Sequence, residues 1–256
     1  TTMPDNDREP KEKQPHFRLR DYLLAALFPP RCHLCGECFN PRFNGGESTF
    51  FGERPIRSPF CSDCTTALSR LYRPTIRQTK AGVYRHLFAY SEETVQKLIF
   101  HIKFCNCSVC HAFAGTIVAC AVERFYPDAD AVIGIPRSVP LMKKYGFDQT
   151  AEMLKPYQKM PRTAPVLDAL YRDPDFSKEQ KGLSARERRF NAFRSLRIRN
   201  NVRVPHSVCV LDDIITTGAT AEAAAYLLQK AGAEKICFLF LAAAERLDYN
   251  EDEDSK

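Results

Sequence analysis

Two adjacent carboxylates followed at once by small hydroxyl residues are the pattern in this sequence that most clearly indicates chemistry. Asp212 and Asp213 lie directly before "IITTGAT" at 214–220. Carboxylates accept hydrogen bonds from sugar hydroxyls and attract Mg²⁺, whereas small residues allow backbone amides to approach a phosphate. Two acids would repel a phosphate that carried nothing else. The pattern therefore indicates a sugar phosphate as the ligand.

The segments on either side of this pattern predict a strand, a loop, a helix and a second strand. "VCVL" at 208–211 is an apolar run of strand length. Apolar residues recur from 221 to 231 at the spacing of one helical face. Gly232 is expected to end this helix, because glycine commonly follows the last helical residue. "KICFLFLAAA" at 235–244 suits a buried parallel strand. In such a unit the positive end of the helix faces the loop and favours a phosphate there.

Two Cys-x-x-Cys pairs predict a tetrahedral zinc site. The four expected ligands are Cys32 and Cys35 in "CHLCG" and Cys61 and Cys64 in "CSDC", separated by 25 residues, a length that zinc ribbons use. The intervening sequence is rich in glycine and proline, so the metal would stabilise what packing cannot, by roughly 10 kcal/mol. Two unrelated reduced pairs and a redox pair are the alternatives, and His33 and Cys38 are rival ligands.

A second group of candidate ligands lies within "KFCNCSVCHAF". The group consists of Cys105, Cys107, Cys110 and His111. Its spacing is compact for a tetrahedral site, and the segment opens a predicted helix that continues through "AFAGTIVACAVERF". Buried or half-exposed thiols are the favoured interpretation, and the role of the group stays open.

Composition limits the class of protein. The 256 residues, 44% of them hydrophobic and 27% charged, suffice for one sizeable core and a small extra module. A net charge of +6 suits anionic ligands and leaves nucleic acid open. Eleven cysteines in a chain with a large core and no apolar signal region favour metal binding over disulfides. No segment approaches about 18 apolar residues, so a cytoplasmic protein without membrane insertion is expected.

The order of the motifs resembles a known family. "VLDDIITTGAT" at 210–220 resembles the phosphoribosyl pyrophosphate (PRPP) signature of type I phosphoribosyltransferases. Together with "LFPPRCHLCG", "FAYSEETVQKLIFHIKF", "IPRSVPLMKKYGFDQT" and "QKGLSARERRFNAF", it follows the order seen in the ComF family, which includes ComFC and GntX-type proteins. That family joins an N-terminal zinc ribbon to a phosphoribosyltransferase-like domain, and the resemblance covers about residues 22 to 245.

The resemblance implies a fold and a binding site. The expected fold is α/β and type I phosphoribosyltransferase-like, with a mostly parallel sheet flanked by helices and a small zinc ribbon in front. PRPP would bind with Mg²⁺, its ribose on Asp212 and Asp213, which would also be the catalytic residues. The residues implied for its 5′-phosphate are Thr216, Thr217, Gly218, Ala219 and Thr220.

A second junction between strand and loop is the expected pyrophosphate site. Residues 131–135 read as a buried strand followed by a turn at Pro136, Arg137 and Ser138. The resemblance implies that this turn holds the pyrophosphate, and the guanidinium of Arg137 could bind phosphate oxygens in bidentate fashion. The family has arginine and asparagine where this chain has Tyr145 and Asp148, so the role of that arginine is not carried over.

Lys103 is expected at the end of a helix. The segment from Ser91, a candidate N-cap, to residue 104 has apolar residues on one face. A lysine in the last turn commonly complements the helix dipole. The resemblance implies instead that Lys103 reaches the pyrophosphate, and both interpretations stay open.

An arginine-rich stretch at 186–203 has three interpretations. Seven arginines lie there, with Phe190 and Phe193 among them. The stretch could be a solvated charged face, a flap over the site, or a patch that binds single-stranded nucleic acid.

The expected organisation is a flexible segment at 1–20, a zinc-ribbon module at 21–75, a phosphoribosyltransferase-like domain at 76–246 and an acidic tail at 247–256. The favoured function is transfer of a phosphoribosyl group from Mg-PRPP to an unidentified acceptor, linked through the family to DNA uptake in natural transformation. The alternative is a non-catalytic competence factor that senses PRPP or binds single-stranded DNA or DNA-uptake proteins. The acceptor, catalysis itself and the oligomeric state stay open.

Overall fold

The computed structural model describes residues 31–39, 45–48, 56–79, 82–176 and 193–244. Its strands are β1 (Gly45–Ser48), β2 (Ile56–Cys61), β3 (Thr75–Thr79), β4 (Gly82–Ala89), β5 (Ala131–Gly134), β6 (Leu170–Arg172), β7 (Leu196–Ile198), β8 (Ser207–Ile215) and β9 (Lys235–Ala243). Its helices are α2 (Ser62–Leu71), α3 (Glu93–Phe104), α4 (Ser108–Phe125), α5 (Val139–Tyr145), α6 (Gln149–Tyr157) and α8 (Ala219–Lys230). A 3₁₀ turn covers Pro174–Phe176.

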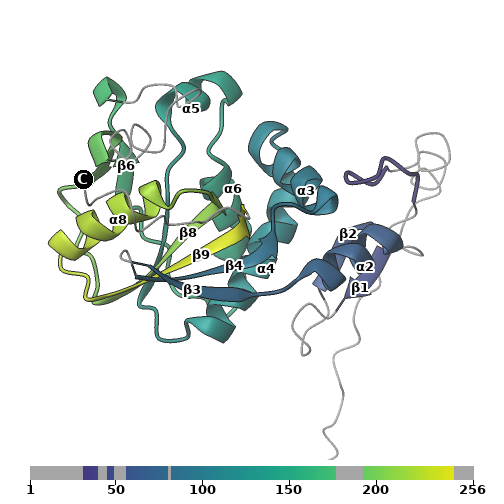
Figure 1. Cartoon of the computed structure of the whole chain (residues 1–256), viewed down its shortest axis with the longest axis horizontal. Helices are drawn as coiled ribbons and strands as arrows, with labels where there is room; N and C mark the ends of the chain where they lie inside the picture. The colour runs from purple at the N-terminus through teal and green to yellow at the C-terminus, as the bar shows by residue number, and fades with distance from the viewer. Residues whose placement is uncertain (1–30, 40–44, 49–55, 80–81, 177–192, 245–256) are drawn as a thin grey trace, which may run out of the picture.

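A five-stranded, mostly parallel sheet lies at the centre of the fold (Figure 1). The strand order is β3-β4-β9-β8-β5, in which the last four are mutually parallel and β3, at the edge, is antiparallel to β4. The predicted α/β class is confirmed. The predicted unit of strand, loop, helix and strand is formed by β8, α8 and β9.

Strand β8 continues further than its apolar run predicts. Its pairing with β9 includes Asp212 opposite Phe240 and ends with Ile215 opposite Ala243. The acid pair therefore lies on a paired strand rather than in a loop. The parallel ladder holds both acids at the carboxyl edge of the sheet, which is where open α/β sheets bind ligands.

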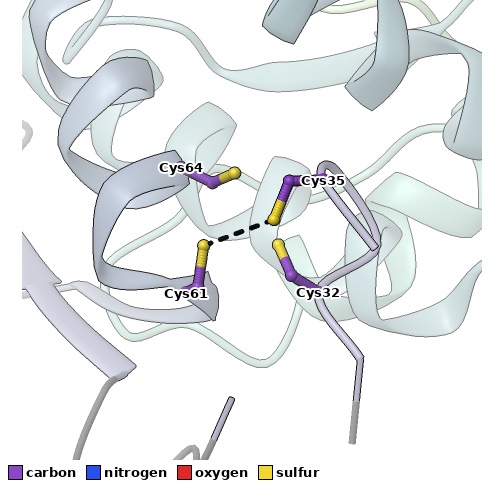
Figure 2. A group of neighbouring side chains, drawn as sticks. All are labelled: Cys32, Cys35, Cys61 and Cys64. Atoms are coloured by element: carbon purple, nitrogen blue, oxygen red, sulfur yellow. Dashed lines mark hydrogen bonds between the residues drawn. The ribbon is translucent and has the colours of Figure 1, made fainter. Parts of the chain in front are cut away.

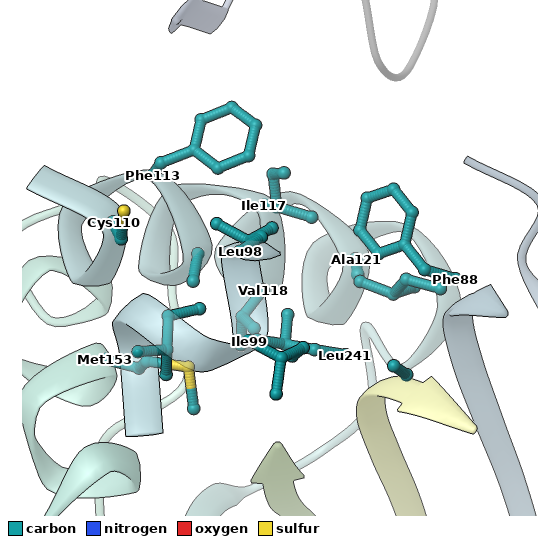
Figure 3. Close-up of a cluster of buried hydrophobic side chains, with 14 of the residues drawn as sticks. Phe88, Leu98, Ile99, Cys110, Phe113, Ile117, Val118, Ala121, Met153 and Leu241 are labelled. Carbon is teal, nitrogen blue, oxygen red and sulfur yellow. The ribbon is translucent and has the colours of Figure 1, made fainter. Parts of the chain in front are cut away.

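Helices cover both faces of this sheet. On one face α3, α4 and α6 pack against β9, as Ile99, Val118, Met153 and Leu241 illustrate (Figure 3). Side chains alternate along a strand, so Phe238 and Phe240 of β9 face the other side. There they join α8 and the β6–β7 pair in a second buried cluster. The sheet is therefore buried on both faces, by α3, α4 and α6 on one side and by α8 with the β6–β7 pair on the other.

Helix α4 is a core helix. Its 18 residues have a mean hydropathy of 1.2, so by length and composition the helix could cross a membrane. Most of these residues are buried inside the protein. This helix corrects the expectation that no segment approaches such a length and hydropathy. The helix is apolar because it packs on the sheet and on α6. At Gly115 the two helices come so close that a Cβ would overlap the carbonyl oxygen of Met153.

The N-terminal module, defined here as residues 31–39 with β1, β2 and α2, packs beside α3 and α4 (Figure 1). Cys32, Phe60 and Leu68 belong to the same buried cluster as α4. The rings of Phe60 and Phe113 meet edge to face with centroids 5.0 Å apart. The module and the α/β domain therefore share one core.

Helix α3 differs from its prediction at its start. Ser91 as the N-cap is wrong, because Glu92 occupies that position without a capping side-chain hydrogen bond. The predicted apolar face is confirmed by the burial of Val95, Leu98, Ile99 and Ile102.

Some predictions concern residues that the structure does not describe. The terminal segments 1–20 and 247–256 lie outside the described residues, as do Arg186, Arg188, Arg189 and Phe190. The proposed boundaries near 75 and 246 stay predictions.

Candidate functional site

Carboxylate, ammonium and guanidinium groups from four segments converge at the carboxyl edge of the sheet. Strand β8 brings the acid pair, the last turn of α3 brings Lys103, the turn after β5 brings Arg137, and β6 ends with Arg172. These segments are far apart in the sequence. Parallel strands end at the same edge, which brings the groups together.

Asp213 and Lys103 form a buried ion pair. The Oδ1 of Asp213 lies 3.2 Å from the Nζ of Lys103, and the Asp213 side chain is 3% exposed. The amide of Ile214 donates to the same oxygen, at 2.6 Å, while Oδ2 is buried without a hydrogen-bond partner among the described residues. Burial opposes the charge of Lys103, but attraction to Asp213 and then Asp212 outweighs it and raises the pKa of this lysine. Lys103 thus reaches the acid pair.

Asp212 is half-buried next to this pair. Its Oδ1 accepts a hydrogen bond from the amide of Asp213, at 2.8 Å. Burial and then repulsion from Asp213 raise the pKa of Asp212 well above its usual range, and Lys103 and Arg172 only partly offset them. Two neighbouring carboxylates in this setting favour a cation or hydroxyl donors between them.

Arg137 is used inside the protein. It is 5% exposed, and its guanidinium donates to the carbonyl oxygens of Lys103 (2.7 Å) and Phe147 (3.3 Å). The guanidinium carbon lies 4.6 Å from the ring centroid of Tyr145, and the Arg137 amide donates to Asp148 at 2.7 Å. The expected bidentate contact with a phosphate would require Arg137 to give up its carbonyl partners. As the side chain lies here, it connects the end of α3 to the turn after β5.

The predicted phosphate loop joins the end of β8 to the start of α8. Thr216 is exposed, Thr217 and Thr220 are half-buried, and Ala219 begins α8. Gly218 is the N-cap of α8 with φ at 74°, a left-handed conformation that glycine adopts without a Cβ penalty. The amides of the first turn of α8 therefore face the end of β8, as a phosphate site requires.

Arg172 and Asp148 lie beside the acid pair and the turn after β5, a placement that the sequence analysis did not predict. Arg172 donates to the Pro136 carbonyl (3.1 Å) and to the hydroxyl of Ser195 (2.8 Å), and its charge attracts Asp212. Asp148 accepts from the amides of Thr150 and Ala151 and so caps α6. Arg172 has no motif around it, whereas the N-cap position of Asp148 before a helix is a signal that could have been read.

A pocket of about 320 Å³ lies beside the turn after β5. Its lining residues include Pro136, Arg137, Lys143, Tyr171, Arg172 and Arg199. Neither Asp212 nor Asp213 lines it, so it adjoins the acid pair without containing it. Its volume lies within the range of small-molecule sites.

Two arginines of the 186–203 stretch, Arg197 and Arg199, form ion pairs with nearby acids. Arg197 lies 3.6 Å from Asp173, and Arg199 lies 3.2 Å from Asp168. Both also lie over aromatic rings, those of Phe176 and Tyr171. In the described part of the stretch, these contacts join β7 to β6 and the segment after it.

The four predicted zinc ligands come together, as Figure 2 shows. The sulfurs of Cys32, Cys35, Cys61 and Cys64 all lie within 4.8 Å of one another. Tetrahedral zinc with Zn–S bonds of about 2.3 Å separates its sulfurs by about 3.8 Å, and the Cys35 and Cys61 sulfurs are 3.6 Å apart. Burial opposes ionisation of Cys32, but backbone amides, including those of Cys61 and Cys35, outweigh it and lower its pKa to about 7. The group fits zinc, and the four thiolates would hold it.

The second cysteine group does not come together as four ligands, although the Cys107 and Cys110 side chains lie within hydrogen-bond reach of each other. Cys110 and His111 are buried in α4, whereas Cys105 is exposed and Cys107 is half-buried. The His111 Nε2 lies 3.0 Å from the carbonyl oxygen of Ile102. The four side chains do not form one metal site.

The fold and site define an α/β protein with an acid pair at the end of a central strand and a cysteine cluster that could bind zinc. Competence protein F from Haemophilus influenzae is 33% identical to this chain over 118 residues, which are 45% of this chain and 51% of that protein. This relative confirms the predicted resemblance to the ComF family. The chain spans about half the length of the curated relative it matches. No protein-family model matches the sequence.

Solved structures with a similar chain arrangement have phosphoribosyl chemistry in their names. Glutamine PRPP amidotransferase from B. subtilis, complexed with ADP and GMP, has a TM-score of 0.37 and 13% identity, covering 64% of this chain and 35% of its own. Purine phosphoribosyltransferase from Pyrococcus horikoshii has a TM-score of 0.30 and 16% identity, covering 52% of this chain and 80% of its own. These similarities concern the path of the chain alone.

Proposed function

We propose that this protein binds PRPP with Mg²⁺ at the carboxyl edge of its sheet. The observation that carries the proposal is the acid pair at the end of β8, directly before a glycine-capped helix N-terminus. The two carboxylates would accept from the ribose hydroxyls and attract the cation that PRPP carries. Thr216, Thr217, Gly218, Ala219 and Thr220 would enclose the 5′-phosphate.

The pyrophosphate part of the ligand would lie towards the turn after β5. Lys103 supplies a positive charge beside Asp213, and Pro136 lines the adjoining pocket. Ser138, the N-cap of α5, would offer its backbone to the same phosphates. Arg137 would contribute mainly by holding Lys103 in place, because its guanidinium already contacts the Lys103 carbonyl. The adjoining pocket with Tyr171 and Arg172 is the candidate position for an acceptor.

The proposed reaction is phosphoribosyl transfer. A nucleophile on the acceptor would attack the anomeric carbon of the ribose, and pyrophosphate would leave as the bond to it breaks. The protein would contribute by positioning the two reactants and by stabilising charge. The described residues contain no evident general base, so the acceptor is not proposed.

A role in competence is the second part of the proposal. It rests on the name of the Haemophilus influenzae relative, Competence protein F. Arg197 and Arg199 give little support to a nucleic-acid-binding patch, because they are paired with Asp173 and Asp168. If the protein is a DNA-binding competence factor, we therefore expect it to bind DNA through the N-terminal module.

Calorimetric titration with PRPP tests the proposed site. Zinc-loaded full-length protein should bind PRPP with Mg²⁺ and much more weakly without it. The double variant Asp212→Asn, Asp213→Asn should lose at least tenfold in affinity, and so should Thr216→Val, whose exposed position makes unfolding no explanation. Asp128→Asn is the matched control, because Asp128 is exposed near Lys235 at the start of β9, the opposite edge. Failure of the folded wild-type protein to bind PRPP with Mg²⁺ would refute the proposal.

A further inference from the structure

Three metal-ligating side chains meet where the N-terminal module touches the α/β domain. His33 lies between Cys32 and Cys35, His101 lies in the last turn of α3, and Cys107 is the N-cap of α4. Each offers one ligand atom, and these three atoms lie within 4.8 Å of one another. The rings of His33 and His101 meet edge to face with centroids 5.5 Å apart. The cluster thus joins residues more than 60 positions apart in the sequence.

The donor atoms suit zinc in type and spacing. Zn–N bonds of about 2.1 Å and Zn–S bonds of about 2.3 Å separate the donors of a tetrahedral site by about 3.3 to 3.8 Å. Separations of at most 4.8 Å reach these values with small side-chain adjustments. Two imidazoles and a thiolate are ligands that zinc prefers, whereas Mg²⁺ and Ca²⁺ take oxygen ligands.

The His101 ring is held by the backbone of the N-terminal module. It makes a hydrogen bond with the backbone of His33. A metal-bound histidine usually directs its second ring nitrogen to a carbonyl or carboxylate, which fixes the orientation of the ring. The backbone of His33 provides such a partner.

The cluster is distinct from the four-cysteine site, although Cys107 also lies beside the buried thiol of Cys110. The sulfurs of Cys32, Cys35, Cys61 and Cys64 already form a complete tetrahedral set, so His33 is not needed as a rival ligand there. Its exposed ring lies against His101 instead.

We infer that His33, His101 and Cys107 bind a second zinc ion, with the fourth position taken by water or an exogenous ligand. Because His33 comes from the module and the other two ligands come from the domain, the ion would connect the two parts. It would also hold the last turn of α3, which presents Lys103 to Asp213. Three protein ligands and one exchangeable position make this site chemically different from the four-cysteine site.

Zinc content of the full-length, reduced protein tests the inference. After equilibration with buffered zinc, the wild-type protein should contain two zinc ions by elemental mass spectrometry. His33→Ala and the double variant His101→Ala, Cys107→Ser should each contain one. His33 is exposed, so its removal leaves the core intact if the double variant, which changes two half-buried residues, fails to fold. The controls His206→Ala and Cys105→Ser change exposed residues outside the cluster and should keep two.

A wild-type protein with one zinc ion would overturn the inference, as would two ions in both variants. Cobalt substitution gives an independent signal, because the charge-transfer absorption grows with the number of thiolate ligands. Five thiolates become four in Cys107→Ser, so that absorption should fall by about one fifth. An unchanged spectrum would show that Cys107 does not bind the metal.

Discussion

Lys103 and Asp213 depend on each other because both are withdrawn from water. Their side chains are 25% and 3% exposed, and Asp213 has one oxygen with no other partner among the described residues. Removing one member of such a pair leaves an uncompensated buried charge, which costs more than the pair itself contributes. Lys103 is therefore a structural residue as well as a candidate ligand-binding one.

Lys103→Met should lower the free energy of unfolding by roughly 3 kcal/mol, because Asp213 then keeps a buried charge without its cation. Adding Asp213→Asn should recover part of this loss, since the unpaired charge disappears. Urea unfolding of the two single variants and the double variant measures both effects.

Lys97→Met on the same helix is the matched control. Lys97 pairs with Glu93 at 2.7 Å, but both side chains are largely exposed. Its loss should change the free energy of unfolding far less than the loss of Lys103, because water screens an exposed ion pair. Equal losses for Lys97→Met and Lys103→Met would contradict the importance of the buried pair.

Single residues show how far the sequence could predict the site. The four cysteines and the acid pair stand in local motifs, so their grouping could be read from spacing alone. The contact of Arg172 with the Pro136 carbonyl and that of Arg137 with the Lys103 carbonyl join segments more than 30 residues apart that meet only after folding. The pairing of His33 with His101 has the same origin. Spacing along the chain contains no information about such contacts.

Helices α4 and α6 approach each other closely at the scale of elements. At Gly115 an added Cβ would overlap both the Met153 carbonyl oxygen and the Pro156 ring. The backbone of α6 cannot move aside cheaply, because Met153 and Tyr157 are themselves buried. The glycine therefore sets the distance between the two helices.

Gly115→Ala should destabilise the protein by roughly 1–3 kcal/mol through overpacking. Alanine is about 1 kcal/mol better than glycine inside a helix, so a net loss would show that the steric contact outweighs helix propensity. Thermal unfolding measures the difference. Ala112→Val adds methyl groups at an exposed position of the same helix and should change stability little. A Gly115→Ala protein as stable as the wild type would contradict the close packing.

Elements were predictable where one face is regularly apolar. The periodic residues of α3 and α8 are buried as predicted, with Ala221, Ala224 and Leu228 facing the core in α8. The start of α3 was not predictable, because Ser91, Glu92 and Glu93 are all compatible with a helix N-terminus. Strand β8 continues through polar Asp212 and Asp213 because it pairs with β9 there. The local sequence around the two acids does not indicate this pairing.

Zinc should matter beyond the N-terminal module at the scale of the whole molecule. Cys32 and Cys61 lie in the buried cluster that also contains Phe113 and Ile117 of α4. Loss of the metal would loosen the residues that cover this face of α4. The stability of the α/β domain is therefore expected to depend on zinc.

Cys64→Ser should lower the midpoint of thermal unfolding of the entire chain by roughly 10–20 °C, because zinc binding contributes several kcal/mol to folding. Circular dichroism at a helix wavelength follows the α/β domain during this transition. Cys105→Ser, at an exposed cysteine, should leave the midpoint unchanged. A separate early transition with a normal main transition would show that the two parts fold independently.

The shared core also determines where the chain can be cut. A fragment that starts after α2 would keep every strand of the five-stranded sheet but would expose Phe113, which is now 3% exposed, together with its apolar neighbours on α4. Exposed apolar patches of this kind promote aggregation. A biochemist who shortens this protein at the apparent border between module and domain should expect an insoluble product, and limited proteolysis of the zinc-loaded protein should find that border resistant.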